Sequence, residues 1–113
     1  MGYSRDYTFY PPEMKEAIVR VFEEERDIEF EAPTESRAVA IRGQFYAYFR
    51  ALRRAEMQLH QNSPEYQEVY DLARKGSQLS VYVEGKKVIL TLKSNTPEMN
   101  ELRRVLAEGV DKK

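Results

Sequence analysis

The feature that most constrains the fold is an uninterrupted helical pattern from Ser36 to His60. Its apolar residues recur at spacings of three and four, so they fall on one side of a helix that turns about 100° per residue. These residues are Ala38, Ile41, Phe45, Tyr48, Phe49, Leu52, Ala55 and Leu59. A stripe of this length has to be buried against other elements, so we expect a central helix on which the rest of the chain packs.

The clearest local signal is a β-hairpin within the segment QLSVYVEGKKVILTLKS. A two-residue turn at Gly85-Lys86 opposes Glu84 with Lys87, and every inward pair beyond it is apolar. The inward pairs are Val83 with Val88, Val81 with Leu90, and Leu79 with Leu92. Moving the turn back by one residue would oppose Val83 with Lys86. The sequence therefore predicts one register, with Gly85 in the first position of a type II′ turn.

Three shorter helices are predicted where a proline stands just inside the start of an apolar periodic segment. They begin at Pro12, Pro64 and Pro97 and end near Glu25, Gly76 and Gly109. We expect Ser63 to cap the second of them. We expect the third to bury Met99, Leu102, Val105 and Leu106.

Two further segments alternate apolar with polar residues. Ile28 and Phe30 alternate with acids over residues 27–31, which predicts a short strand with one buried face. Tyr3, Tyr7 and Phe9 alternate near the N-terminus. That pattern is consistent with a second short strand, with an aromatic arm folded over the core, or with an arm that stacks on nucleotides.

Together these elements predict an α+β fold. A small antiparallel sheet, made of the C-terminal β-hairpin plus one or two short strands, packs against the long central helix and two or three shorter helices. With 113 residues the chain has the length of one domain, which we assign to residues 1–113. Residues 1–10 form an aromatic N-terminal segment, and residues 110–113 are expected to fray.

Composition excludes several kinds of chemistry. The chain has no cysteine, so disulfides, thiolate catalysis and cysteine zinc sites are absent, and His60 is its one histidine. We expect no catalytic residue, no metal site and no cofactor, and hence a protein that is not an enzyme. No signal peptide or membrane-spanning apolar run is apparent, which favours a cytoplasmic protein without membrane contact.

The second face of the long helix is basic and includes one tyrosine. The candidate binding residues there are Arg42, Tyr46, Arg50, Arg53 and Arg54. Residues 36–55 contain five arginines and no acid, whereas residues 13–35 contain nine acids and three bases. The chain is thus electrically polarised although its net charge is −1.

This basic flank suggests two functions from different classes. The first hypothesis is a small non-enzymatic nucleic-acid-binding protein, or an accessory of nucleic-acid machinery, in which arginines contact phosphate and Tyr46 stacks on a base. The alternative is a protein-interaction module, such as a regulatory subunit or inhibitor. It would use the same flank or the acidic surface of residues 23–31, and a homodimer is one variant.

The interpretation without a binding function is that the arginines are solvated, or paired within the chain to the acids at 23–31. If those acids cover Tyr46, the nucleic-acid hypothesis fails. An enzyme built from carboxylates, arginines and tyrosines ranks last, because no convergent group of such residues is visible in the sequence.

Overall fold

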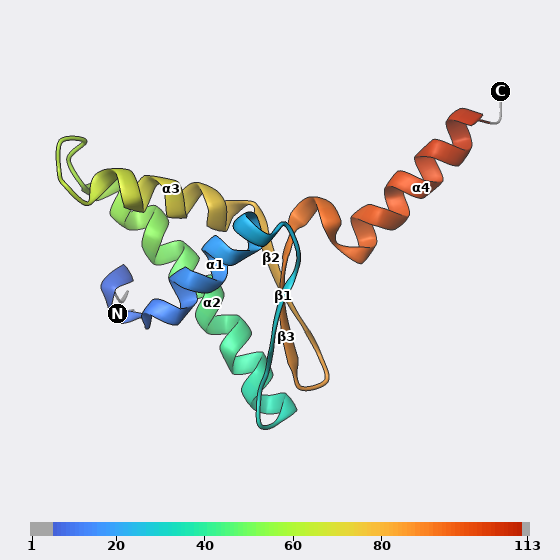
Figure 1. The fold of residues 1–113 in the computed structure, drawn as a ribbon, viewed down its shortest axis with the longest axis horizontal. Helices are drawn as coiled ribbons and strands as arrows, with labels where there is room; N and C mark the ends of the chain where they lie inside the picture. The colour runs from blue at the N-terminus through green and yellow to red at the C-terminus, as the bar shows by residue number, and fades with distance from the viewer. Residues whose placement is uncertain (1–5, 112–113) are drawn as a thin grey trace.

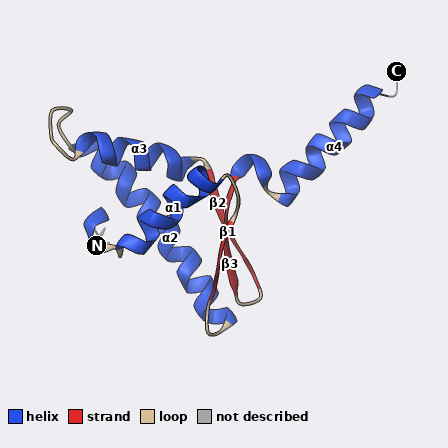
Figure 2. Cartoon of the chain, viewed as in Figure 1, coloured by secondary structure: helices blue, strands red, loops and turns tan. Residues whose placement is uncertain are grey.

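The structure is a computed structural model that describes residues 6–111. Figures 1 and 2 show how its elements follow one another along the chain. In order they are the 3₁₀ helix η1 (Tyr7–Phe9), α1 (Pro12–Glu24), β1 (Ile28–Glu31), α2 (Glu35–Gln58), α3 (Tyr66–Ser77), β2 (Leu79–Glu84), β3 (Lys87–Leu92), the 3₁₀ helix η2 (Lys93–Asn95) and α4 (Pro97–Asp111). The predicted α+β fold is therefore confirmed.

The three strands form one antiparallel sheet in the order β1-β3-β2. The hairpin has the predicted register, since Glu84 opposes Lys87 and each inward apolar pair is in place. Gly85 has a φ of +60° while Lys86 keeps a negative φ, as a type II′ turn requires. β1 adds to the other side of β3, where Ile28 opposes Leu90.

Helices α1 and α2 pack on one face of this sheet, and α3 packs against both of these helices (Figure 1). The core lies between the sheet and the three helices. The Oγ1 atom of Thr34 accepts a hydrogen bond from the amide of Arg37 at 3.1 Å and so caps α2. From the predicted α2 stripe, Ala38, Phe45, Tyr48, Phe49 and Leu52 are buried. The central helix is therefore confirmed.

Of the three alternatives for the N-terminal segment, the structure shows an aromatic arm over the core and no strand across residues 6–10. Tyr7 and Phe9 belong to a 3₁₀ helix, and Tyr7 and Tyr10 pack against the core. Asp6 caps this helix by accepting a hydrogen bond from the amide of Thr8. Tyr3 lies outside the described residues. Ser63 does not cap α3, because residues 63–66 form a separate turn closed by the amide of Tyr66 and the carbonyl of Ser63.

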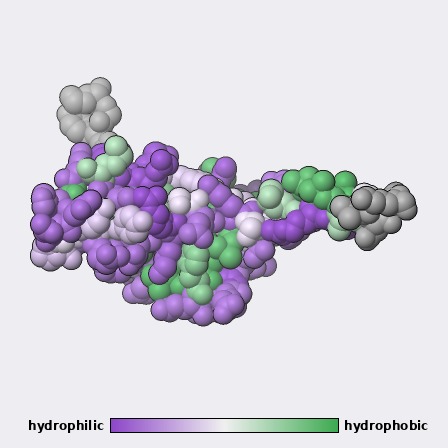
Figure 3. Space-filling model, turned by 90° about the horizontal axis from the view of Figure 1, so that it is seen from above, coloured by the Kyte–Doolittle hydropathy of each residue, from purple (hydrophilic) through white to green (hydrophobic). Residues whose placement is uncertain are grey.

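The prediction for the last helix is wrong in its burial. Met99, Leu102, Val105 and Leu106 are 39%, 47%, 54% and 60% exposed, instead of forming a buried stripe. The reason is that α4 extends away from the sheet and the other helices and packs mainly on the adjoining η2 (Figures 1 and 3). Gly109 does not end this helix, which continues to Asp111.

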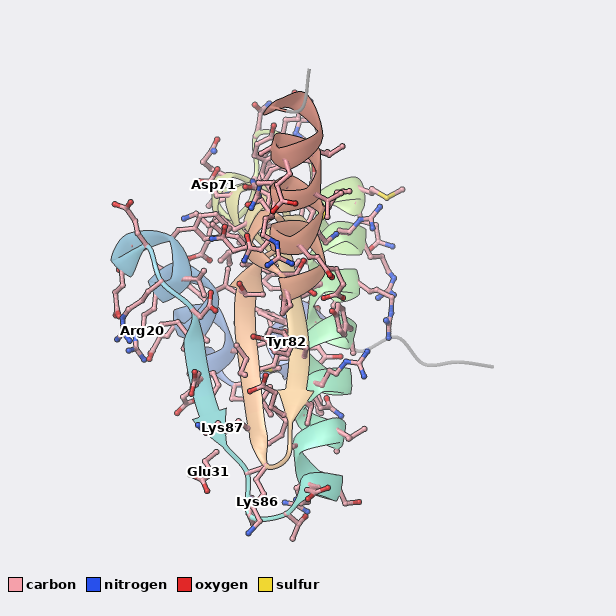
Figure 4. All side chains as sticks on the ribbon, turned by 90° about the vertical axis from the view of Figure 1, so that its right-hand side faces the viewer. Arg20, Glu31, Asp71, Tyr82, Lys86 and Lys87 are labelled. Atoms are coloured by element: carbon pink, nitrogen blue, oxygen red, sulfur yellow. The ribbon has the colours of Figure 1, made fainter. Side chains whose placement is uncertain are left out.

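The second face of the sheet is turned away from α1, α2 and α3. Figure 4 looks onto this face, with Tyr82 and Lys87 labelled on it and Lys86 at the hairpin turn. Lys87 forms an ion pair with Glu29 on the neighbouring strand at 3.8 Å. Ile89, which opposes Tyr82, is only 3% exposed although it does not belong to the core cluster.

Candidate functional site on helix α2

The candidate site is the solvent-facing flank of α2. Arg42, Arg50 and Arg53 are exposed there, and helical geometry places them within roughly 80° of arc. Along the axis they extend over roughly 16 Å, at 1.5 Å per residue. Within residues 6–111, no carboxylate forms an ion pair with any of these three arginines. We call Arg42, Arg50 and Arg53 the arginine flank.

Tyr46 lies between Arg42 and Arg50 around the helix. Its hydroxyl donates a hydrogen bond to the carbonyl of Val81 at 3.2 Å and accepts one from the amide of Val81 at 2.9 Å. The edge of its ring packs against Phe49 with a centroid separation of 5.8 Å. The Arg42 guanidinium lies 5.8 Å from the Tyr46 ring centroid. The side chain is half-buried and fixed at its hydroxyl, which suits it to position Arg42.

Arg54 lies at one margin of the arginine flank, roughly 40° around the helix from Arg50 and 120° from Arg42. It is half-buried, whereas the other three arginines are exposed. It lines a groove of about 400 Å³ between α2 and η1, together with Asp6, Tyr7 and Leu59. The structure therefore exposes three of the four predicted arginines and partly covers the fourth.

The acids at 23–31 do not cover Tyr46. Tyr46 contacts β2, whereas these acids adjoin β1 at the opposite edge of the sheet. Glu24 is instead bound by Arg20 at 2.8 Å and by Arg26 at 2.6 Å. Hydrogen bonds from Arg20 and Arg26 lower the pKa of the Glu24 carboxyl. The acid cluster is thus partly neutralised by arginines of its own region.

One acid on α2 is neutralised from the neighbouring helix. Glu56 stands close to Arg53 in sequence, but its carboxylate pairs with Arg74 of α3 and its side chain is only 15% exposed. The Arg74 guanidinium also lies 4.8 Å from the ring centroid of Tyr70. The Glu56–Arg74 pair ties α3 to α2, and it leaves Glu56 unavailable to Arg53.

Two apolar side chains on the same flank were not among the predicted site residues. Val39 is 55% exposed and Met57 is 85% exposed. Helical geometry places both between Arg42 and Arg50 around the axis. Their positions outside the apolar stripe were the signal in the sequence, because a non-polar residue on an exposed helix face is available for contact with another molecule.

Two further features are absent from the described residues. Across residues 6–111, no group of three or more His, Asp and Glu side chains is arranged to hold a metal ion. None of the described helices combines the length and the apolar composition needed to cross a membrane.

Comparison of the chain with models of protein families, with curated proteins and with solved structures gave no match.

Proposed function

We propose that this protein is a non-enzymatic nucleic-acid-binding protein that holds the phosphate backbone on the arginine flank of α2. The supporting observation is that Arg42, Arg50 and Arg53 are exposed and form no ion pair with a described carboxylate. A guanidinium group remains charged at all physiological pH values and matches phosphate geometry with paired N–H donors. Three such groups along one helix can contact several phosphates at once.

Tyr46 has a positioning role in this proposal. Its hydroxyl is bound to Val81 and its ring lies beside the Arg42 guanidinium, so it restricts where Arg42 can reach. Base stacking would instead need a ring that is open on one face and free to adjust. The proposal therefore assigns phosphate contact to the arginines and makes no claim of base-specific recognition.

Salt dependence provides the quantitative test. Three phosphate contacts to duplex DNA predict a slope of about −2.7 for log affinity against log salt concentration, and about −2.1 for a single strand. Between 50 and 200 mM salt the duplex affinity should fall about 40-fold. Fluorescence anisotropy with labelled single-stranded and double-stranded oligonucleotides measures both slopes.

The variant Arg50→Glu/Arg53→Glu should abolish this binding while its circular dichroism spectrum stays unchanged, because both side chains are exposed. The matched control is Lys86→Glu/Lys93→Glu. It changes the net charge by the same amount at two exposed positions that do not belong to α2. Equal loss of affinity in both variants would point to non-local charge alone, and no binding by the wild type at low salt would refute the proposal.

A protein-interaction module is the second candidate, and the exposure of Val39 and Met57 beside the arginines favours it. Arginine and methionine are both enriched at protein interfaces. For this candidate the oligonucleotide titrations should give no binding. Pull-downs should instead recover a partner that is lost with Met57→Asp as well as with Arg50→Glu/Arg53→Glu.

A further inference from the structure

Helix α4 is the part of the described chain with the least cover. Every residue from 97 to 109 is exposed. The helix projects from the rest of the molecule (Figure 1). The longest dimension of the molecule, with α4 included, is 54 Å. The start of α4 is fixed, because Arg103 donates hydrogen bonds to the Asn100 side chain at 2.7 Å and to the carbonyl of Ser94. These hydrogen bonds of Arg103 therefore fix the direction in which α4 projects.

One side of α4 is apolar. Met99, Leu102 and Leu106 follow the three-then-four spacing of a coiled-coil seam, and Val105 lies beside it. These four side chains are 39% to 60% exposed. Hydrophobic surface gathers along one edge of the projecting helix, and the bulk of the molecule lies beyond the start of the helix (Figure 3). The outward positions include Asn100, Glu101 and Arg104. This is the pattern of a helix that pairs with another helix.

Little apolar surface lies beside α4 for this stripe to fold back onto. The groove near the start of α4 is lined by Val21, Phe22 and Leu92, but also by the charged residues Glu25, Arg26 and Asp27. The open face of the sheet is the nearest large surface, but its Ile89 and Thr91 are already 3% and 1% exposed. Around them lie the Glu29–Lys87 ion pair and the half-buried Tyr82 (Figure 4). Covering charged groups with apolar side chains is unfavourable, so α4 has more to gain from an external helix.

The charges that flank the seam are complementary to those of a second copy of α4. With Met99 and Leu106 at a positions and Leu102 at d, Glu98 falls at g and Arg103 at e. In a parallel pair, a g residue lies beside the e residue of the next heptad on the other helix. Glu98 of each copy would then meet Arg103 of the other. Arg103 has five N–H donors, so its present two bonds leave donors for this contact.

We propose that α4 pairs in parallel with α4 of a second copy of this chain, as a short two-stranded coiled coil. Each seam residue meets its own counterpart, and each flank has a Glu98–Arg103 pair. The helix has 15 residues, or roughly 22 Å, which is about two heptads. So short a seam predicts a weak dimer that dissociates on dilution. The proposal does not depend on the arginine flank of α2.

Sedimentation velocity over a series of protein concentrations tests the dimer. The mass should rise from 13.3 kDa toward twice that value between low micromolar and millimolar concentration. Leu106→Asp should weaken the dimer at least about tenfold, because a carboxylate would enter the apolar seam. Leu106 is 60% exposed in the single chain, so the variant should keep its fold.

Ala107→Asp is the matched control, since it adds the same charge one residue away on an outward position and should leave the mass series unchanged. A protein that stays at 13.3 kDa throughout would overturn the proposal, whether α4 folds back or awaits another protein. A dimer that survives Leu106→Asp would also overturn it, because the interface would lie elsewhere.

The absence of cysteine from the chain allows a direct test of orientation. Leu102→Cys places one thiol in the seam, where a parallel pair brings the two copies of position 102 together. Mild oxidation should link this variant into a dimer and leave the outward control Arg104→Cys unlinked. If Leu102→Cys fails to form a disulfide while the mass series still shows a dimer, the parallel arrangement is refuted.

Discussion

The hydroxyl group of Tyr46 on α2 satisfies both backbone groups of Val81 on β2, accepting from its amide and donating to its carbonyl. Residues of an antiparallel strand alternate in the direction of their backbone groups, and those of Val81 point away from β3. β2 is an edge strand, and an uncovered edge can pair with another strand. Tyr46 thus attaches the central helix to the sheet and occupies part of that edge.

Tyr46→Phe should lower the free energy of unfolding by about 1–2 kcal/mol, because two half-buried backbone groups lose their partner while the ring stays in place. Urea unfolding followed by circular dichroism measures the change. Tyr66→Phe is the control, since no hydrogen bond joins the Tyr66 hydroxyl to a described residue. The control should stay within about 0.5 kcal/mol of the wild type. Equal losses in both variants would contradict the proposed attachment.

The parts of the fold that could be predicted from sequence are those fixed by local pattern. The hairpin register follows from which side chains a two-residue turn brings together, and no distant residue competes with that rule. The buried stripe of α2 follows from helical spacing alone. The arginine flank adjoins this stripe on the same helix, which is why its exposure could be anticipated.

The remainder depends on contacts between distant residues. A stripe such as Met99, Leu102 and Leu106 shows that a helix needs a partner, but its spacing is the same whether that partner is its own sheet or another chain. Likewise, nothing near Tyr46 in the sequence indicates that its hydroxyl meets Val81. The partial burial of Arg54, in contrast to the other three arginines, depends on where η1 packs.

The two glycines of neighbouring helices should respond oppositely to the same substitution. A Cβ atom added to Gly43 of α2 would meet no atom within 4 Å, so Gly43→Ala should stabilise the protein by about 1 kcal/mol through helix propensity. A Cβ atom added to Gly76 of α3 would lie 3.0 Å from the Phe49 ring. Gly76→Ala should therefore destabilise it by about 1–3 kcal/mol. Urea unfolding of both variants tests the pair, and changes of the same sign would contradict it.

The Gly43→Ala variant also tests the proposed function of the arginine flank. Gly43→Ala keeps every arginine, so oligonucleotide affinity should stay unchanged if the phosphate backbone binds through Arg42, Arg50 and Arg53. Anisotropy titration at fixed salt measures this. A large loss of oligonucleotide affinity in this more stable variant would mean that the nucleic acid packs closely against Gly43, so that binding does not rest on the three arginines alone.

Glu25 ends α1 in the left-handed region, with a φ of +53°. A side chain pays about 1 kcal/mol to adopt this conformation, and a carboxylate at a helix C-terminus opposes the helix dipole. Glu25→Gly should therefore raise the free energy of unfolding by about 1 kcal/mol. Glu23→Gly, inside the helix, should lower it by a similar amount. Thermal unfolding of the two variants measures the difference. A loss of stability in both variants would show that the conformation of Glu25 is not strained.

Tyr48 should make the protein sensitive to alkaline pH. Its ring is 4% exposed and packs on Tyr10 with a centroid separation of 5.2 Å. Burial, with smaller effects from Glu68 and Tyr7, raises the pKa of the Tyr48 hydroxyl from 10.0 to about 12. The unfolded chain therefore releases this proton at lower pH than the folded protein does. The stabilisation is complete below pH 10 and is lost as the pH rises from 10 to about 12.

Tyr48→Phe has no proton to release at this position, so its free energy of unfolding should fall less steeply than that of the wild type across the same pH range. Urea unfolding at a series of alkaline pH values measures both slopes, and tyrosinate absorbance of the folded protein should show one late-ionising group that the variant lacks. Tyr66→Phe serves as the control because Tyr66 is only half-buried, whereas Tyr48 is buried. Parallel slopes for wild type and Tyr48→Phe would show that the Tyr48 hydroxyl titrates normally.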